Sequence, residues 1–233
     1  ALAERICDLA TKMPYGKGAD SLSIQHGIHL STKRFWMCVQ REAERIEDVL
    51  AEEAKMLFER GEAPGAIDLK GERPLIIGID GGHVRGWKDN PSFEVKCVTV
   101  ATGSEPGPGK KRRLVDRVGY AANCSVDDFR KRVATLTIKN GYLTASARIF
   151  VSDGAAWIPK MIADYFPDAI HVLDMYHLKS KITKLFGVNA EGMDAELRDE
   201  VRAAADTYDP EYILELLRSW QPAERYRLEA KDD

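Results

Sequence analysis

Three aspartates each follow a short apolar stretch of the chain: Asp80 follows LIIGI, Asp153 follows IFVS and Asp174 follows HVL. Such stretches indicate buried strands. In mixed and parallel sheets the residues at the carboxyl ends of strands line the ligand crevice, so these acids are expected to lie close together. Neighbouring carboxylates repel one another unless a cation lies between them. The pattern therefore predicts a site for Mg2+ or Mn2+ among these aspartates.

Small and cationic residues surround these acids. Gly81, Gly82 and Gly154 have no side chain, so the backbone and a substrate phosphate can approach one another closely. A solvated charged loop is the default interpretation of the KKRR run at residues 110–113. Contact with the phosphate backbone is the alternative, and it predicts a steep salt dependence of binding. The candidate DNA-binding cations are His83, Arg85, Lys88, Lys110, Lys111, Arg112 and Arg113.

Each candidate also has a structural interpretation. Asp80 and Asp153 each precede a glycine, and Asp-Gly is a common turn pair. Asp174 is as well placed to cap a helix over KSKITKL as to act in the site. His177 is either a packed histidine or a residue that organises the site. Trp157 is interpreted as core packing, with base stacking as the alternative.

The elements that would position these residues alternate between strands and helices over residues 71–180. The expected strands are LIIGIDG, FEVKCVTVATG, KRRLVDRVGYA and ARIFVSDGA, and AIHVLDMYHL is either a fifth strand or a strand-to-helix junction. The first three are expected to form an antiparallel meander. Helices are expected at SVDDFRKRVATLTIKNG, where Ser125 is the cap, and at IPKMIADYFP. This order predicts an α/β fold with a mixed sheet flanked by helices.

Both flanks of this core have a helical pattern. In residues 1–70 a long helix is expected, with Ser31 or Thr32 as its N-cap and Gly61 at its end, after a shorter helix and a turn. The pattern indicates either a simple connector or a helix-turn-helix that reads DNA, with Lys33, Arg34 and Arg41 facing phosphates. Residues 181–233 are expected to be entirely helical.

Composition sets wider limits on the function. The 233 residues are 44% hydrophobic, which allows a substantial core, and the formal net charge is -3. Residues 71–180 are the basic part, with 16 basic and 12 acidic groups, as is usual for nucleic-acid binders. Four scattered cysteines suggest neither a zinc module nor a disulfide framework. No apolar stretch approaches the roughly 20 residues of a membrane span and no leader opens the chain, so a cytoplasmic protein is expected.

The order of the elements, Asp80 after the first strand, an SDG motif at Asp153, and a D-x-x-H motif from Asp174 to His177 resemble the RNase H-like catalytic core of DDE transposases. The closer resemblance is to the Mutator-like superfamily of bacterial insertion sequences, and it covers residues 73 to about 180. It implies a polynucleotidyl transferase for transposition, a form of DNA recombination. Asp80 and Asp153 would bind two Mg2+ or Mn2+ ions, while Asp174 and His177 would organise the site.

The resemblance further implies DNA partners, namely transposon ends and a target, a homo-oligomer on DNA, and association with the nucleoid. The family's third ligand is a glutamate that follows a helical insertion, and residues 181–233 resemble the start of such an insertion. We therefore expect the chain to stop before that glutamate. If the insertion is short, the substitutes are Glu211, Glu215 and Glu224.

Two other classes of protein remain open. Sugar kinases of the actin-like ATPase superfamily also begin with a strand that enters a D-G-G phosphate loop, and IGIDGG fits that opening. They need a second glycine-rich phosphate loop, which SDGAAW matches poorly. The other alternative is a catalytically inactive, transposase-derived protein that binds DNA, because the third acidic ligand is not identifiable.

Overall fold

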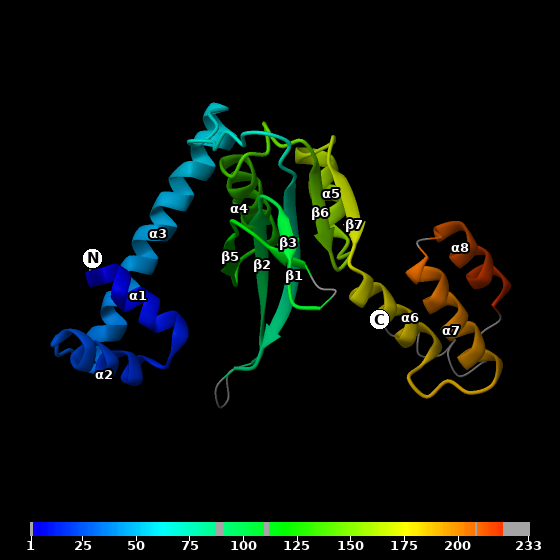
Figure 1. The fold of residues 1–233 in the computed structure, drawn as a ribbon, viewed down its shortest axis with the longest axis horizontal. Helices are drawn as coiled ribbons and strands as arrows, with labels where there is room; N and C mark the ends of the chain where they lie inside the picture. Colours follow the sequence, from blue (N-terminus) through cyan, green and yellow to red (C-terminus); the bar gives the residue numbers. More distant parts are fainter. Residues whose placement is uncertain (1, 87–90, 110–111, 208, 221–233) are drawn as a thin grey trace. The chain divides into compact units, whose positions relative to one another are not determined.

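The computed structural model describes residues 2–86, 91–109, 112–207 and 209–220 (Figure 1). The chain divides into two compact units, Ala1–Gly65 and Ala66–Asp233. In the described ranges, no helix is both long and apolar enough to cross a membrane.

The first unit consists of three helices, α1 (Leu2–Lys12), α2 (Tyr15–His26) and α3 (Thr32–Arg60). They enclose a small core of Ile6, Leu22 and Phe35, each almost fully buried. The predicted ends of α3 are confirmed. Its N-terminus is capped by the Ser31 hydroxyl, which accepts from the backbone N–H of Arg34, and its C-terminus ends at Gly61, whose φ of +69° is left-handed.

The second unit is built on a five-stranded sheet (Figure 1). The first three sheet strands pair antiparallel as a meander, and the last two run parallel to the first. This mixed sheet with flanking helices confirms the predicted α/β fold class. In spatial order its strands are β5 (Val118–Ala122), β2 (Phe93–Ala101), β1 (Leu75–Val84), β6 (Arg148–Ser152) and β7 (Ile170–Leu173).

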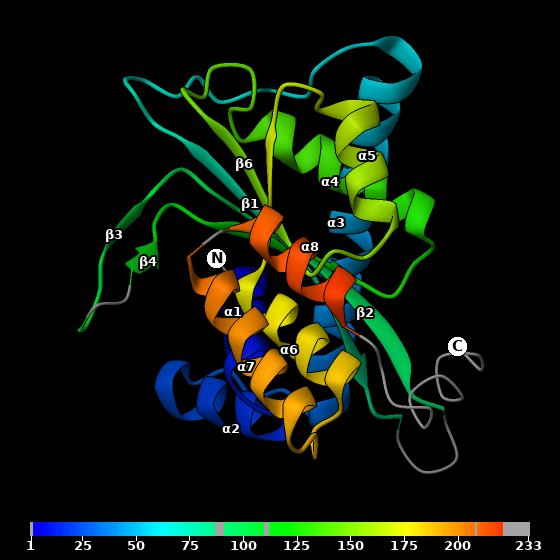
Figure 2. The same cartoon turned by 90° about the vertical axis from the view of Figure 1, so that its right-hand side faces the viewer.

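The core of this unit lies between one face of the sheet and two helices, α4 (Val126–Lys139) and α5 (Trp157–Tyr165). Figure 2 shows these helices near one another, and they are in contact. Side chains alternate along β1, so Leu75, Ile77 and Ile79 are buried on one face. Phe129 of α4 is fully buried and meets the ring of Trp157 edge-on, 5.9 Å between centroids. The core-packing interpretation of Trp157 is therefore confirmed.

The expected third strand, KRRLVDRVGYA, is wrong as a single element. It is divided into β4 (Arg112–Leu114) and β5, and β4 pairs with β3 (Ser104–Pro106) in a separate two-stranded hairpin. The break falls at Asp116, whose φ of +46° is left-handed and cannot continue a strand. Only β5 therefore joins the main sheet.

The expected end of the first strand at Asp80 is also wrong. β1 continues through Gly81 and Gly82 to Val84, because its antiparallel pairing with β2 persists as far as Val84 opposite Phe93. Its parallel pairing with β6, by contrast, stops at Ile79. Asp80 therefore lies where β1 loses β6 as its neighbour. On the other side β5 still pairs with β2 as far as Ala122 opposite Lys96, so β1 and β2 form a two-stranded ribbon only from Gly82 onward.

As far as Trp220 the described chain after β7 forms three helices, α6 (Met175–Phe186), α7 (Met193–Asp206) and α8 (Pro210–Ser219), which confirms the helical prediction for that part, while residues 221–233 lie outside the described residues. These helices have a core of their own, centred on Ile182, Phe186 and Val201 (Figure 2). Asp209 caps α8 by accepting from the backbone N–H of Tyr212 at 3.0 Å, with Pro210 in the first turn, as the sequence indicated.

Candidate active site

The structure brings the three predicted aspartates to one edge of the sheet. Ile79 pairs with Ser152 and Ser152 pairs with Leu173, so the next residue on each strand is an aspartate. The backbone N–H of Asp174 donates to the Ser152 carbonyl at 2.7 Å, which continues the ladder by one residue. Because neighbouring strands lie about 4.8 Å apart, Asp80 within β1 forms a row with Asp153 and Asp174, which directly follow β6 and β7.

The two carboxylate oxygens of Asp80 differ in their hydrogen bonds. Its Oδ1 accepts from the backbone N–H of Gly81 at 2.8 Å and lies 3.6 Å from Nε2 of His177. Its side chain is 63% exposed, and Oδ2 accepts no hydrogen bond from any residue the structure describes. That oxygen is therefore accessible to a ligand from solvent.

Asp153 begins a tight turn after β6. Its Oδ1 accepts from the backbone N–H of Ala155 at 3.0 Å, an Asx-type turn. Gly154 has a left-handed φ of +77°, and a Cβ at this position would lie 2.7 Å from Leu173 Cδ1. The left-handed backbone therefore favours glycine here, whether or not a substrate phosphate comes near, and the Leu173 side chain would have to shift to admit a Cβ.

A hydrogen-bonded pair, the buried Ser152 and the exposed His171, lies next to this turn. The Ser152 hydroxyl is almost fully buried, accepts from the backbone N–H of Gly154 at 3.3 Å, and shares a hydrogen with His171 Nε2 at 2.9 Å. Desolvation by burial lowers the pKa of His171 below its ordinary value. The neutral imidazole is thus favoured beneath Asp153.

Asp174 is the N-cap of α6. Its Oδ1 accepts from the backbone N–H groups of Tyr176 at 2.7 Å and His177 at 3.3 Å, so the capping interpretation is confirmed. The cap fixes the first turn of α6, from which His177 reaches Asp80. Asp174 therefore acts on the row of acids at least through its hold on His177.

Lys181 is a site residue that the sequence analysis did not single out. Its Nζ donates to the Asp153 carbonyl at 2.9 Å. Residues four apart share a helix face, so His177 and Lys181 project together from α6, one toward Asp80 and the other toward Asp153. The signal in the sequence is this spacing, an H-x-x-x-K pattern that begins at the histidine of the D-x-x-H motif.

The predicted cations after the first strand occupy the ribbon beyond Asp80. His83 lies opposite Glu94 in the β1–β2 ladder, and Arg85 follows the end of β1. Lys88 lies outside the described residues. A Cβ at Gly82 would meet nothing within 4 Å, whereas one at Gly81 would lie 3.2 Å from Glu94 Oε1. The ribbon thus has open space beside Gly82.

The structure does not bring the arginines of the KKRR run to the acids. Arg112 donates to the hydroxyl and carbonyl of Ser104 at 2.9 and 2.7 Å, and Arg113 pairs with Glu105 at 2.5 Å, all within the β3–β4 hairpin. The base of this hairpin meets the start of β1, where Asp116 pairs with Arg73, at the end of the sheet opposite Asp80. Lys110 and Lys111 fall outside the described residues.

The donor set fits a hard cation only in part. Asp80 and Asp153 each have one carboxylate oxygen without a described hydrogen bond, and such oxygens suit Mg2+ or Mn2+. Among the residues whose placement is described, no group of three His, Cys, Asp or Glu side chains could hold a metal ion. Of the substitute third ligands, Glu211 and Glu215 border a pocket on α8 with Leu214. Glu224 is not among the described residues.

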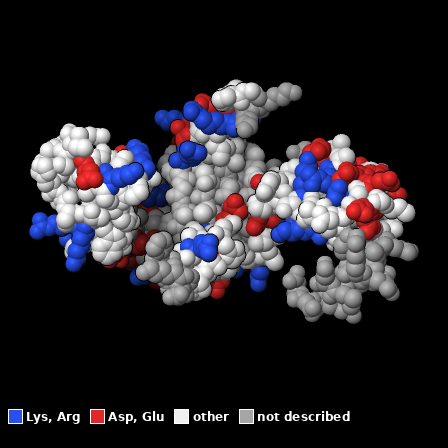
Figure 3. Space-filling model, turned by 90° about the horizontal axis from the view of Figure 1, so that it is seen from below, with Lys and Arg blue, Asp and Glu red and all other residues white. Residues whose placement is uncertain are grey.

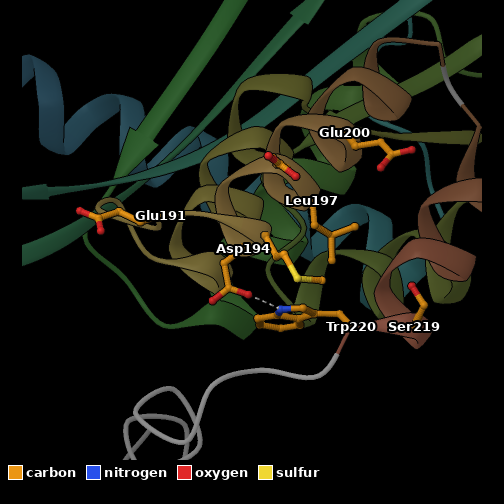
Figure 4. A pocket seen from close by; sticks show the side chains of 8 residues that line it. Glu191, Asp194, Leu197, Glu200, Ser219 and Trp220 are labelled. Carbon is orange, nitrogen blue, oxygen red and sulfur yellow. Dashed lines mark hydrogen bonds between the residues drawn. The ribbon is translucent and has the colours of Figure 1, made fainter.

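A larger pocket lies among the C-terminal helices, away from the row of acids (Figure 4). Trp220 closes one side of it, where its indole Nε1 donates to Asp194 Oδ1 at 3.0 Å. Acidic side chains gather on this helical segment in Figure 3, which makes the pocket unsuitable for a phosphate. Its lining residues are Glu191, Met193, Asp194, Glu196, Leu197, Glu200, Ser219 and Trp220.

The fold and the site define an α/β protein with a mixed sheet and a row of carboxylates where its parallel pairing ends. The chain belongs to the Uncharacterised protein family (UPF0236), whose model matches residues 42–231. This match begins within α3, so the first two helices precede it. No curated protein matches the chain.

Proposed function

We propose that this chain carries the catalytic core of a DDE-type DNA transposase, an enzyme that cleaves and joins DNA strands with a divalent metal. The observation that supports this proposal most directly is the register of β1 and β6. Ile79 lies opposite Ser152, so Asp80 and Asp153 follow at equivalent positions on adjacent strands. Two carboxylates held side by side by the backbone are suited to share a divalent cation.

In this proposal Asp80 and Asp153 hold Mg2+ or Mn2+ through their open oxygens. When bound, such ions activate a water or a 3' hydroxyl for in-line attack on a phosphodiester and stabilise the leaving oxygen. The chain's own groups fix the two carboxylates. The Gly81 N–H orients Asp80, and the Ala155 N–H orients Asp153. His177 Nε2 lies 3.6 Å from the same Asp80 oxygen, Oδ1.

Double-stranded DNA is the proposed partner of the first unit as well. The start of α3 is cationic, with Lys33, Arg34 and Arg41 all exposed. The rest of the helix is rich in acids, so charge is segregated along one element. Because this cationic end follows α2 after a turn at Gly27, it has the element order of a helix-turn-helix. Transposon ends, a homo-oligomer on DNA and a place at the nucleoid follow from the same proposal.

A second candidate is a catalytically inactive, transposase-derived DNA-binding protein. The observation that favours it is the lack of a three-ligand group for a metal within the described residues. Two carboxylates alone bind a divalent ion weakly, so this alternative predicts DNA binding without cleavage. The two candidates therefore differ in one measurable property.

The experiment uses the complete product of the gene that encodes this chain, with a supercoiled plasmid carrying the DNA that flanks the gene. Strand cleavage and joining are followed with Mg2+ or Mn2+ and after chelation. We expect metal-dependent cleavage that Asp80→Asn and Asp153→Asn each abolish, while Asp48→Asn, a change of an exposed aspartate on α3, leaves it intact. Cleavage of normal rate by either site variant would refute the proposal, and DNA binding without cleavage would favour the inactive alternative.

A further inference from the structure

We propose that Lys181 binds a phosphate of the DNA at the row of acids, as a substrate-binding residue of the reaction. The inference rests on the proposed function, which it deepens. It starts from one helix face. His177 and Lys181, one turn apart on α6, reach Asp80 and the Asp153 carbonyl respectively. Helix α6 therefore carries both the imidazole that approaches Asp80 and the ammonium that contacts Asp153.

The hydrogen bond of Lys181 positions its charge without using it up. An ammonium has three donors, and within the described part of the chain Lys181 uses one, toward the Asp153 carbonyl at 2.9 Å. A carbonyl is neutral, so the full positive charge remains, and the Lys181 side chain is exposed. The two remaining N–H groups are free to donate to phosphate oxygens, which form strong charge-assisted hydrogen bonds.

Gly154 lies next to the Lys181 ammonium. A Cβ on Gly154 would lie 3.4 Å from Lys181 Nζ, an ordinary van der Waals distance. The ammonium is therefore close against the Asp153 turn, where Gly154 has no side chain. The same turn that orients the Asp153 carboxylate therefore also seats the cation.

A cation at this site would weaken the repulsion between its carboxylates and a DNA phosphate. A DNA phosphate that approaches Asp80, Asp153 and Asp174 meets three carboxylates, and like charges at short range repel. Lys181 offsets this repulsion at the one strand end where it is anchored. It has no lone pair for a metal when protonated, so its role is toward the anionic substrate and not toward the metal.

The alternative is that Lys181 only ties α6 to the turn after β6. Substitutions that separate charge from packing distinguish the two roles. Lys181→Met keeps most of the aliphatic stem and removes the charge, and Lys181→Arg keeps the charge. Lys184→Met is the matched control, because Lys184 is exposed on the same helix and its side chain has no described hydrogen bond or ion pair.

The test measures binding of the complete gene product to a duplex from the flanking DNA, by fluorescence anisotropy, without divalent metal and over a range of salt concentrations. We expect Lys181→Met to reduce the slope of log affinity against log salt by about one. At low salt it should weaken binding about tenfold. Lys181→Arg should restore both values, and Lys184→Met should change neither. Thermal unfolding of each variant shows whether the fold is retained.

An unchanged salt slope in folded Lys181→Met overturns the inference, as does an equal loss in Lys184→Met. Loss of thermal stability in Lys181→Met with no change in slope for the molecules that remain folded also overturns it, because it identifies a structural tie. Cleavage is scored separately. If cleavage requires Asp80 but the salt slope of Lys181→Met is unchanged, only this inference is refuted. If Asp80→Asn cleaves DNA normally, the proposed function is refuted.

Discussion

His177 Nε2 lies 3.6 Å from Asp80 Oδ1, although the two residues come from motifs almost a hundred positions apart. The contact depends on Asp174, which caps α6 and sets the direction of its first turn. The first strand, the last strand and the helix that follows it therefore converge on one carboxylate. This convergence makes Asp80 the centre of the site and yields predictions about its supports.

The cap of α6 can be separated from the charge of Asp174. Asp174→Ala removes the acceptor for two backbone N–H groups and should destabilise the protein by about 1 kcal/mol. Asp174→Asn should retain most of this stability, since asparagine caps helices as well as aspartate does. Urea unfolding measures both. Asp209→Ala, at the cap of α8, is the matched control for loss of a cap outside the site. If Asp174→Asn were as unstable as Asp174→Ala, the capping account would be wrong.

Substitution of two glycines at the row of acids should affect stability to very different extents. Gly154→Ala should destabilise the fold by about 1–3 kcal/mol, because its φ is +77° and a Cβ would lie 2.7 Å from Leu173 Cδ1. Gly82→Ala should change stability by less than about 0.5 kcal/mol, because nothing lies within 4 Å of the added atom. Equal effects in chemical denaturation would contradict this description of the turn.

A clamp at the other end of β6 makes stability depend on pH. The Tyr142 hydroxyl donates to the Asp168 carboxylate, and this hydrogen bond holds the pKa of Asp168 below its ordinary value. A depressed folded-state pKa gives stability that is present above the unfolded-state pKa, about 4, and is lost as pH falls through the folded-state value. Tyr142→Phe should therefore make stability fall less steeply below about pH 4.

Unfolding by urea at several pH values measures this slope. Asp168→Asn should flatten the same window, since it removes the titrating group itself. A slope in Tyr142→Phe equal to that of the unmodified chain would show that the hydrogen bond does not shift the pKa of Asp168.

The cationic start of α3 should contribute to DNA binding if the first unit contacts DNA. Replacement of Lys33, Arg34 and Arg41 by alanine should lower the salt slope of duplex binding by up to about three, one for each phosphate contact. Lys55→Ala is the control, because Lys55 lies in the acidic part of α3, 4.0 Å from Glu52. An unchanged slope in the triple variant would favour the connector interpretation of residues 1–70.

Local signals in the sequence predicted the elements well. The caps at Ser31, Ser125 and Asp209 are confirmed. They could be predicted because a cap depends only on one side chain and the backbone two or three residues away. The strand pattern predicted β1, β6 and β7. The parallel register of these strands places the three aspartates next to one another. Such features need only short-range chemistry and the geometry of parallel pairing.

Features that depend on distant partners were not predictable in the same way. β1 extends past Asp80 because β2 continues to pair with it, which no local pattern of β1 reveals. The break at Asp116 depends on its left-handed φ. The alternation of apolar and polar residues around Asp116 is typical of a continuous strand and gives no sign of that angle. Lys181 became a candidate only when the fold placed its ammonium against Asp153. The sites of Lys88, Lys110 and Lys111 stay predictions.

The central claim is that Asp80 and Asp153 form a metal-dependent catalytic pair. The most direct measurement is the rate of strand cleavage by the complete gene product on its flanking DNA, with the DNA ends mapped, for the unmodified protein and for Asp80→Asn. The account predicts cleavage that requires Mg2+ or Mn2+, leaves 3' hydroxyl ends, and falls by about a hundredfold or more in Asp80→Asn with the fold intact. Cleavage by Asp80→Asn at the unmodified rate would contradict it.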